Sequence, residues 1–249
     1  MKRDATRPGT PNRPAPARGG PAPPAGLELD ARRAGRVRAV EALRGGRTPL
    51  TLLEAADHGT RIAEEAVRSA AEADPPPPSA CREGCDWCCH LTVGTSVPEV
   101  VRVLEYLRRT LPPDEFRALR ERVVRRDEQR RGLTGADRAR ARLPCSLLVN
   151  RRCAAYPVRP LMCRGFNSSD ASLCERFVNG TGKTPLPLYA PQVRLTALVL
   201  DGMNAGLAES GLRGERLELT AALRIALDVP GAVERFLAGE PAFAAARLD

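Results

Sequence analysis

The sequence predicts a mainly α-helical protein with an irregular, cysteine-rich metal-binding core and one short β-hairpin. Three observations lead to this fold class. Apolar residues recur at helical spacing, no alternation of strands and helices is visible, and all eight cysteines lie in two short segments. Because a parallel sheet with crossover helices needs the alternation that this chain lacks, we expect helices packed against cysteine-bearing loops.

Residues 1–26 are rich in Pro, Gly and Arg and nearly free of large apolar side chains. Because such a segment buries too little apolar surface to offset its ordering entropy, we expect a disordered basic tail. The segment carries five basic residues and one acid. An electrostatic tether is one interpretation of that charge, and an inert extension is the simpler one.

Two helices are predicted within residues 27–74. The first covers residues 28–44, where apolar side chains recur at near-helical spacing until Gly45-Gly46. The second covers residues 50–73, where small and branched apolar side chains follow one face. Four consecutive prolines, Pro75 to Pro78, end this helix and form a stiff spacer before the first cysteines.

Helices are also predicted between the two cysteine segments. Ser96-Val97-Pro98-Glu99 is a capping box with proline in the first turn, so we expect a helix from there to about Arg109. Pro112-Pro113-Asp114 opens another helix. Residues 108–142 hold twelve arginines and six acids. This mixture of signs is typical of a solvated helix rather than of a nucleic-acid-binding stripe.

A short hairpin is predicted at the second cysteine segment. Ser146 to Val149 and Arg152 to Tyr156 have the pattern of short strands, and Asn150-Arg151 has that of a turn. Such a hairpin would present Cys145 and Cys153 side by side.

The C-terminal region 175–249 is expected to be helical and to pack on the cysteine region 81–174. Proline and glycine punctuate it into three predicted helices. These helices cover residues 190–210, 215–228 and 231–238.

The composition is that of a protein from a reducing compartment. No apolar stretch follows the basic N-terminus within the first 26 residues, so we expect no secretory signal. No run of about 18 apolar residues appears, so we expect no membrane span and a cytoplasmic location. The net charge of +9 permits association with nucleic acid but does not favour it, because the charges are spread along the chain.

The cysteine cluster is the strongest functional signal in the sequence. In a reducing cytosol, thiols in such tight groups are more often metal ligands than disulfides, so all eight are candidate ligands. They are Cys81, Cys85, Cys88, Cys89, Cys145, Cys153, Cys163 and Cys174. Two zinc ions with four thiolates each would use them all, whereas a four-iron four-sulfur (4Fe-4S) cluster would use four. Because Cys88 and Cys89 are neighbours, their side chains diverge, and only one is expected to join Cys81 and Cys85.

The gap pattern of the first segment also occurs in radical S-adenosylmethionine enzymes. Cys81-x-x-x-Cys85-x-x-Cys88, with Trp87 before the third cysteine, would leave one iron of a cluster open for substrate. Those enzymes resemble α/β barrels, and the helices predicted here argue against such a barrel.

The first segment, with Cys88-Cys89, and the run from Tyr156 to Phe166 resemble the YkgJ-type cysteine-cluster family over about residues 81–174. One departure is the first gap, which has three residues here and two in the family signature. The resemblance implies a zinc- or iron-chelating domain. A flagellin lysine methylase resembles the family in its cysteine cluster and is thought to use an iron–sulfur centre with S-adenosylmethionine. Methyl transfer is therefore an alternative, by analogy alone.

Arg159, Arg164 and Tyr156 are expected to surround the metal centre without binding the metal. The arginines would neutralise anionic thiolates and donate hydrogen bonds to sulfur. Ion pairs with nearby acids, such as Asp170 or Glu175, explain the arginines equally well. The ring of Tyr156 would help to exclude water from the centre.

Large rings gather at the cysteine segments. Four of them are Trp87, Tyr156, Phe166 and Phe177. Because large rings bury much apolar area, we expect the best-packed part of the protein around the thiols. His90 also lies there, but with eight cysteines available we do not expect it to be a ligand.

The main hypothesis is an intracellular metal-binding protein that coordinates zinc or an iron–sulfur cluster through its cysteines. One alternative is an iron–sulfur-dependent methyltransferase or redox enzyme that uses S-adenosylmethionine. Another is a zinc module associated with nucleic acid. The sequence identifies no catalytic residue and no protein partner, so it leaves open whether the centre is catalytic.

Overall fold

The computed structural model describes residues 23, 25–82, 84–133, 135–181 and 185–248. The tail predicted over residues 1–26 therefore lies almost wholly outside the described residues. Helices dominate the described part, and its strands form two short antiparallel pairs, which confirms the mainly α fold class. No helix within these ranges is long and apolar enough to cross a membrane.

The predicted helices are all present, and most begin and end close to where the sequence places them. They are α1 (Ala25–Leu43), α2 (Pro49–Ala73), α3 (Val97–Thr110), α4 (Pro113–Arg130), α8 (Ala190–Glu209), α9 (Leu219–Asp228) and α10 (Ala232–Leu237). Three short helices were not predicted, because five to eight residues give too little periodicity to detect. They are α5 (Gly135–Ala141), α6 (Leu161–Gly165) and α7 (Ala171–Val178). Short 3₁₀ turns cover Trp87–His90 (η1), Tyr156–Val158 (η2) and Ala244–Ala246 (η3).

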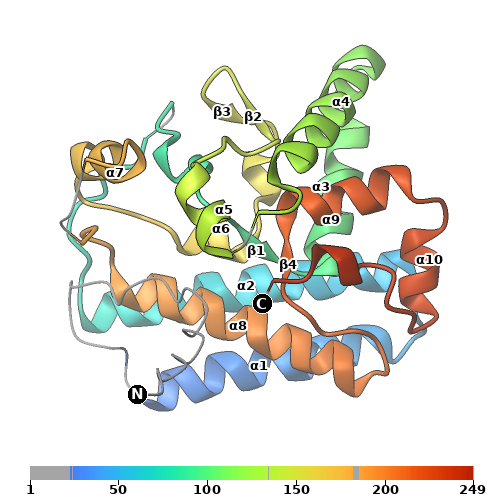
Figure 1. Ribbon diagram of the computed structural model, residues 1–249. Helices are drawn as coiled ribbons and strands as arrows, with labels where there is room; N and C mark the ends of the chain where they lie inside the picture. The colour runs from blue at the N-terminus through green and yellow to red at the C-terminus, as the bar shows by residue number, and fades with distance from the viewer. Residues whose placement is uncertain (1–22, 24, 83, 134, 182–184, 249) are drawn as a thin grey trace, which may run out of the picture.

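Helices α1, α2 and α8 form a layer along one side of the molecule (Figure 1). Glycines bring α1 and α8 together. A Cβ atom at Gly35 would lie 2.6 Å from the carbonyl oxygen of Val199, and one at Gly202 would lie 2.0 Å from that of Arg32. Because any larger residue would collide with backbone, glycine at these positions permits the close pairing of the two helices.

The main hydrophobic core joins α3, α4, α9 and the C-terminal segment. Leu107, Leu119 and Leu223 are almost completely buried there. The rings of Phe236 and Phe243 pack edge to face, with their centroids 5.9 Å apart at 87°. Such pairs add to the stability gained from buried apolar area.

The prediction that the best-packed region surrounds the thiols is wrong. Phe236 is 1% exposed, whereas Tyr156 is 61% exposed. Trp87 and Phe166 are only partly buried. The physical reason is that a ring needs apolar walls on all sides. Long helices supply such walls, and the short cysteine-bearing elements do not.

The described residues contain two strand pairs, one a local hairpin and one that joins distant segments. The hairpin of β2 (Leu148–Val149) and β3 (Arg152–Cys153) lies where it was predicted, and Leu148 pairs with Cys153. Asn150 and Arg151 adopt positive φ angles of 47° and 63°, as a tight hairpin turn requires.

The second pair corrects the sequence prediction of a helix from residue 215. Residues Leu217–Glu218 form strand β4, which pairs with β1 (Gly94–Thr95). The helix begins only after Glu218, whose carboxylate accepts from the backbone N–H of Ala221 at 2.7 Å. The cap and the long-range strand pairing therefore set this boundary, and the local apolar pattern does not reveal either.

Candidate metal centre

The cysteines reach one side of the helical layer from several short elements. Cys81 and Cys85 follow the proline spacer, and Cys88 and Cys89 lie in η1. Cys145 precedes the hairpin and Cys153 lies in β3. The last two, Cys163 and Cys174, lie in α6 and α7. All eight carry free thiols.

One group of thiols forms where η1 meets the second cysteine segment. The backbone N–H of Cys145 donates to the carbonyl oxygen of Cys89 at 2.7 Å. The hairpin folds Cys153 back beside this contact. The thiols of Cys145, Cys153 and Cys88 lie close enough to Cys163 for their ionised forms to raise its pKa. Thiols from segments more than fifty residues apart therefore lie near one another.

Another group of thiols forms at α7. The Cys81 sulfur and the backbone N–H of Ala80 both lie against the carbonyl oxygen of Ser168, at 3.9 and 2.8 Å. Helix α7 packs on η1. The charges of Cys81, Cys85 and Cys88 act on Cys174. Cys88 thus lies near both groups.

Burial raises the pKa of most thiols in the group near the hairpin. It raises the pKa of Cys145 to about 12 and that of Cys163 well above its usual value. Cys88 is the exception, because a hydrogen bond from the Cys89 thiol lowers its pKa, and the charge of Arg159 lowers it further. The same bond raises the pKa of Cys89. The group therefore keeps most of its protons until a cation displaces them.

The donor set fits a soft metal ion, because thiolates are the ligands that zinc and iron–sulfur centres use. As placed, no three Cys, His, Asp or Glu side chains in the described ranges are arranged to hold an ion. His90 instead has its Nδ1 atom 3.2 Å from the carbonyl oxygen of Asp86. Side-chain rotation of the thiols would therefore have to accompany binding.

Glu99 joins the start of α3 to the helix that carries Cys163. It is completely buried. One carboxylate oxygen accepts from the Ser96 N–H and hydroxyl, both at 2.9 Å, and from the Thr95 hydroxyl at 3.1 Å. The other accepts from the backbone N–H of Leu161 at 2.7 Å, at the start of α6. The capping box is thus confirmed, and the same residue also caps α6 and so positions Cys163.

Arg102 lies one turn further along α3 and binds the segment just before the start of α6. It is 6% exposed. Its guanidinium donates to the Thr60 hydroxyl at 2.6 Å, to the carbonyl oxygen of Ala56 at 3.1 Å and to that of Val158 at 3.4 Å. Arg102 therefore ties α2 to the segment that leads into α6.

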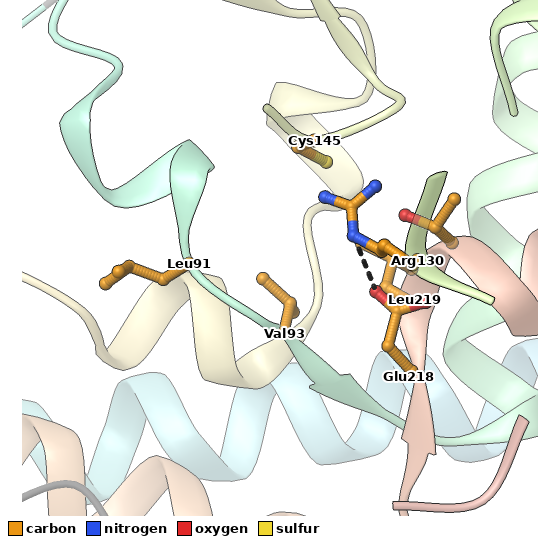
Figure 2. A pocket seen from close by; sticks show the side chains of 7 residues that line it. Leu91, Val93, Arg130, Cys145, Glu218 and Leu219 are labelled. Carbon is orange, nitrogen blue, oxygen red and sulfur yellow. Dashed lines mark ion pairs between the residues drawn. The ribbon is translucent and has the colours of Figure 1, made fainter. Parts of the chain in front are cut away.

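A buried ion pair lies beside Cys145 (Figure 2). The Nε atom of Arg130 lies 4.0 Å from a carboxylate oxygen of Glu218. The same guanidinium donates to the carbonyl oxygens of Leu143 and Pro144 at 2.8 and 3.1 Å. Arg130 thereby fixes the backbone that immediately precedes Cys145.

The two arginines predicted around the centre take different roles. Arg159 stacks on the exposed ring of Tyr156 at 4.0 Å, and its charge favours the thiolate form of Cys88. Arg164 pairs with Glu64 of α2 at 2.8 Å. The sequence suggested Asp170 or Glu175 as an acidic partner, but the partner in the structure is Glu64. Asp170 instead accepts from the backbone N–H of Ser172 at 2.8 Å, at the start of α7.

Residues 80–181 match the model of the CxxCxxCC family, described as "Putative zinc- or iron-chelating domain". Over these residues the chain is similar to that family. The chelating domain spans every cysteine of the chain, together with Glu99, Arg102 and Arg130, but less than half of its length. Its description supports metal binding in general and leaves the metal open. No curated protein and no solved structure matches the chain.

Sequence reasoning missed the buried polar residues that position the thiols. Glu99 was recognised only as the start of a helix, and Arg130 only as one of many arginines in a solvated segment. A glutamate within a run of apolar residues was the one local signal available for Glu99. Nothing local indicates that Arg130 meets Glu218, because 87 residues separate them.

Proposed function

We propose that this chain is an intracellular metal-binding protein whose cysteine thiolates hold two zinc ions or iron-containing centres. The observation that carries the proposal is the meeting of thiols from residues 81–89 and 145–174 within a domain of zinc- or iron-chelating description. Free thiols persist in a reducing compartment, which is why we propose an intracellular location.

The two groups of thiols support a specific division of ligands. The first centre would take the thiolates near α7, namely Cys81, Cys85, Cys88 and Cys174. The second would take those near the hairpin, namely Cys89, Cys145, Cys153 and Cys163. Each set offers four thiolates, the number that a tetrahedral zinc ion or one four-iron cluster requires. The division also gives the neighbouring Cys88 and Cys89 to different centres.

A bound ion would cross-link short elements that have little apolar core of their own. The residues of this chain then act as a frame: Glu99 and Arg102 hold the approach to Cys163, and Arg130 holds the approach to Cys145. The charge of Arg159 near Cys88 would offset part of the negative charge of four thiolates.

Anaerobic purification followed by elemental analysis and a visible spectrum tests the proposal. We expect about two centres per chain in the wild type and about one in Cys85→Ser and in Cys163→Ser, because each variant disrupts a different set. A brown protein absorbing broadly near roughly 400 nm would identify iron–sulfur centres, and a colourless protein with zinc would identify a structural site. Unchanged metal content in both variants, or a wild type without metal, would contradict the proposal.

A further inference from the structure

A groove of about 420 Å³ lies between one face of α4 and the β2–β3 hairpin. The helix contributes Ala118, Leu119 and Arg122, and the hairpin contributes Val149 and Cys153. The groove therefore reaches one of the candidate ligands from the outside. Its volume is in the range of sites for small molecules, which is about 300–1,000 Å³.

Arg122 brings a positive charge to this groove. The Nε atom of Arg122 donates to the carbonyl oxygen of Ser146 at 3.0 Å, and within the described ranges no carboxylate pairs with its guanidinium. Burial lowers the pKa of Arg122, and the positive charges of Arg125 and Arg126 lower it further. An anion at this position would relieve that repulsion.

Most other arginines of α4 have acidic partners. Arg125, for example, pairs with Glu121 at 3.7 Å, whereas Arg126, like Arg122, has no carboxylate partner within the described ranges. Glu115 also lines the groove. It lies seven residues before Arg122, which is about 10 Å along a helix, so it does not neutralise that end of the groove.

Asn150 and Arg152 of the hairpin also line the groove, and its other walls are apolar. Val149 is 37% exposed and is among the few large apolar side chains that reach the surface, while Leu119 forms the floor at 1% exposure. Ala118, the smallest side chain of the three, also lines the groove and leaves room above that floor. A ligand with an apolar body gains stability by covering these side chains.

We propose that the groove binds a small organic acid, whose carboxylate pairs with Arg122 and whose apolar body covers Ala118 and Val149 beside Cys153. A carboxylate matches the fork of donors on a guanidinium, because its two oxygens can accept from two N–H groups at once. The binding itself does not require the metal. Its relevance to the second centre rests on the proposed function, in which Cys153 is a ligand.

An NMR titration of the full-length, ¹⁵N-labelled protein tests this site, with hexanoate as the probe and 1-hexanol as its neutral counterpart. Hexanoate should shift backbone resonances from both the helix face at residues 115–122 and the hairpin at residues 149–154. Hexanol should bind at least about fivefold more weakly, because it lacks the charge that Arg122 recognises. In Arg122→Gln, hexanoate affinity should fall about tenfold, to the level of the alcohol.

Two further variants control the interpretation. Arg125→Gln removes a charge from the same helix at a residue that does not line the groove, and it should leave hexanoate affinity within twofold. Ala118→Trp fills the groove and should abolish the shifts from both probes while the helical circular dichroism is retained. Equal hexanoate affinity in Arg122→Gln and wild type, or shifts confined to other surfaces, would overturn the proposal.

The metal content of each sample is measured separately, so the two proposals fail in different ways. A protein that lacks metal but binds hexanoate through Arg122 would remove the proposed function and leave the groove as a ligand site. A protein that holds two centres but does not distinguish hexanoate from hexanol would remove the groove site alone.

Discussion

The helical layer and the cysteine region are held together by different forces. In the layer of α1, α2 and α8, backbones touch at glycines, and side chains such as Leu195 and Val199 are completely buried. In the cysteine region, the elements that carry the cysteines are at most eight residues long, and seven of the eight thiols are only partly buried or exposed. Packing alone is sufficient to order the layer, whereas the cysteine segments depend on a few buried polar anchors and, we propose, on metal.

The largest expected effect is on the layer itself. In Gly202→Leu, the new side chain would begin 2.0 Å from the Arg32 carbonyl oxygen, so α1 and α8 would have to separate. We expect a loss of more than about 3 kcal/mol in the free energy of unfolding, measured by urea denaturation. Gly26→Ala, on α1 with nothing within 4 Å of the new Cβ, should leave stability unchanged or slightly raised. Similar effects from the two variants would contradict the close pairing.

The next effect concerns the anchor beside Cys145. Arg130→Met leaves the buried carboxylate of Glu218 without its cationic partner and frees two carbonyl oxygens. We expect a loss of about 3 kcal/mol, together with loss of metal from the second centre only. Arg131→Met, at the exposed neighbouring position, is the control and should cost less than about 0.5 kcal/mol. Full metal content in Arg130→Met would show that Arg130 does not position Cys145.

A smaller effect is expected at the anchor of α6. Glu99→Gln keeps the shape of the side chain but replaces one accepting oxygen by an N–H group, which then faces donors that Glu99 now satisfies. The expected loss is about 2 kcal/mol, with reduced metal at the second centre. Glu105→Gln, on the same helix, should change neither quantity. If both variants behave alike in thermal unfolding and elemental analysis, Glu99 is not an anchor for Cys163.

The smallest expected effect is a pH dependence of the free energy of unfolding in the metal-free protein. Burial raises the pKa of Cys145 from 9.0 to about 12, so the folded chain holds a proton that the unfolded chain releases between these values. The stability from this neutral thiol is complete below about pH 9 and is lost as the pH rises towards 12, by up to about 1.4 kcal/mol per pH unit. Urea unfolding at pH 8, 9 and 10 measures the slope. The slope should be smaller in Cys145→Ala, and an unchanged slope would assign it to other groups.

The same contrast explains what the sequence could predict. The long helices and the capping box at Ser96 follow from local patterns, as does the hairpin turn at Asn150-Arg151, because each depends on residues a few positions apart. The grouping of the cysteines was predictable because metal chemistry gathers thiols from separate segments.

The errors lie where distant residues decide the structure. The strand at residues 217–218 depends on pairing with Gly94, and the partner of Arg164 is Glu64, exactly one hundred positions away. The prediction that the best-packed rings surround the thiols was wrong, because the best-buried rings are Phe236 and Phe243. The side chains that bury them come from helices outside the cysteine segments. Composition near a site does not reveal where the tightest packing will occur.

Hydrogen exchange of the metal-loaded and metal-depleted protein, followed by mass spectrometry, compares the two regions directly. We expect peptides from α1 and α8 to exchange at the same rate in both samples. Peptides covering residues 84–95 and 143–178 should exchange at least about tenfold faster once a chelator has removed the metal under reducing conditions. Equal protection of the cysteine segments with and without metal would contradict a folding role for the thiolate-bound ions, and so would equal loss of protection in both regions.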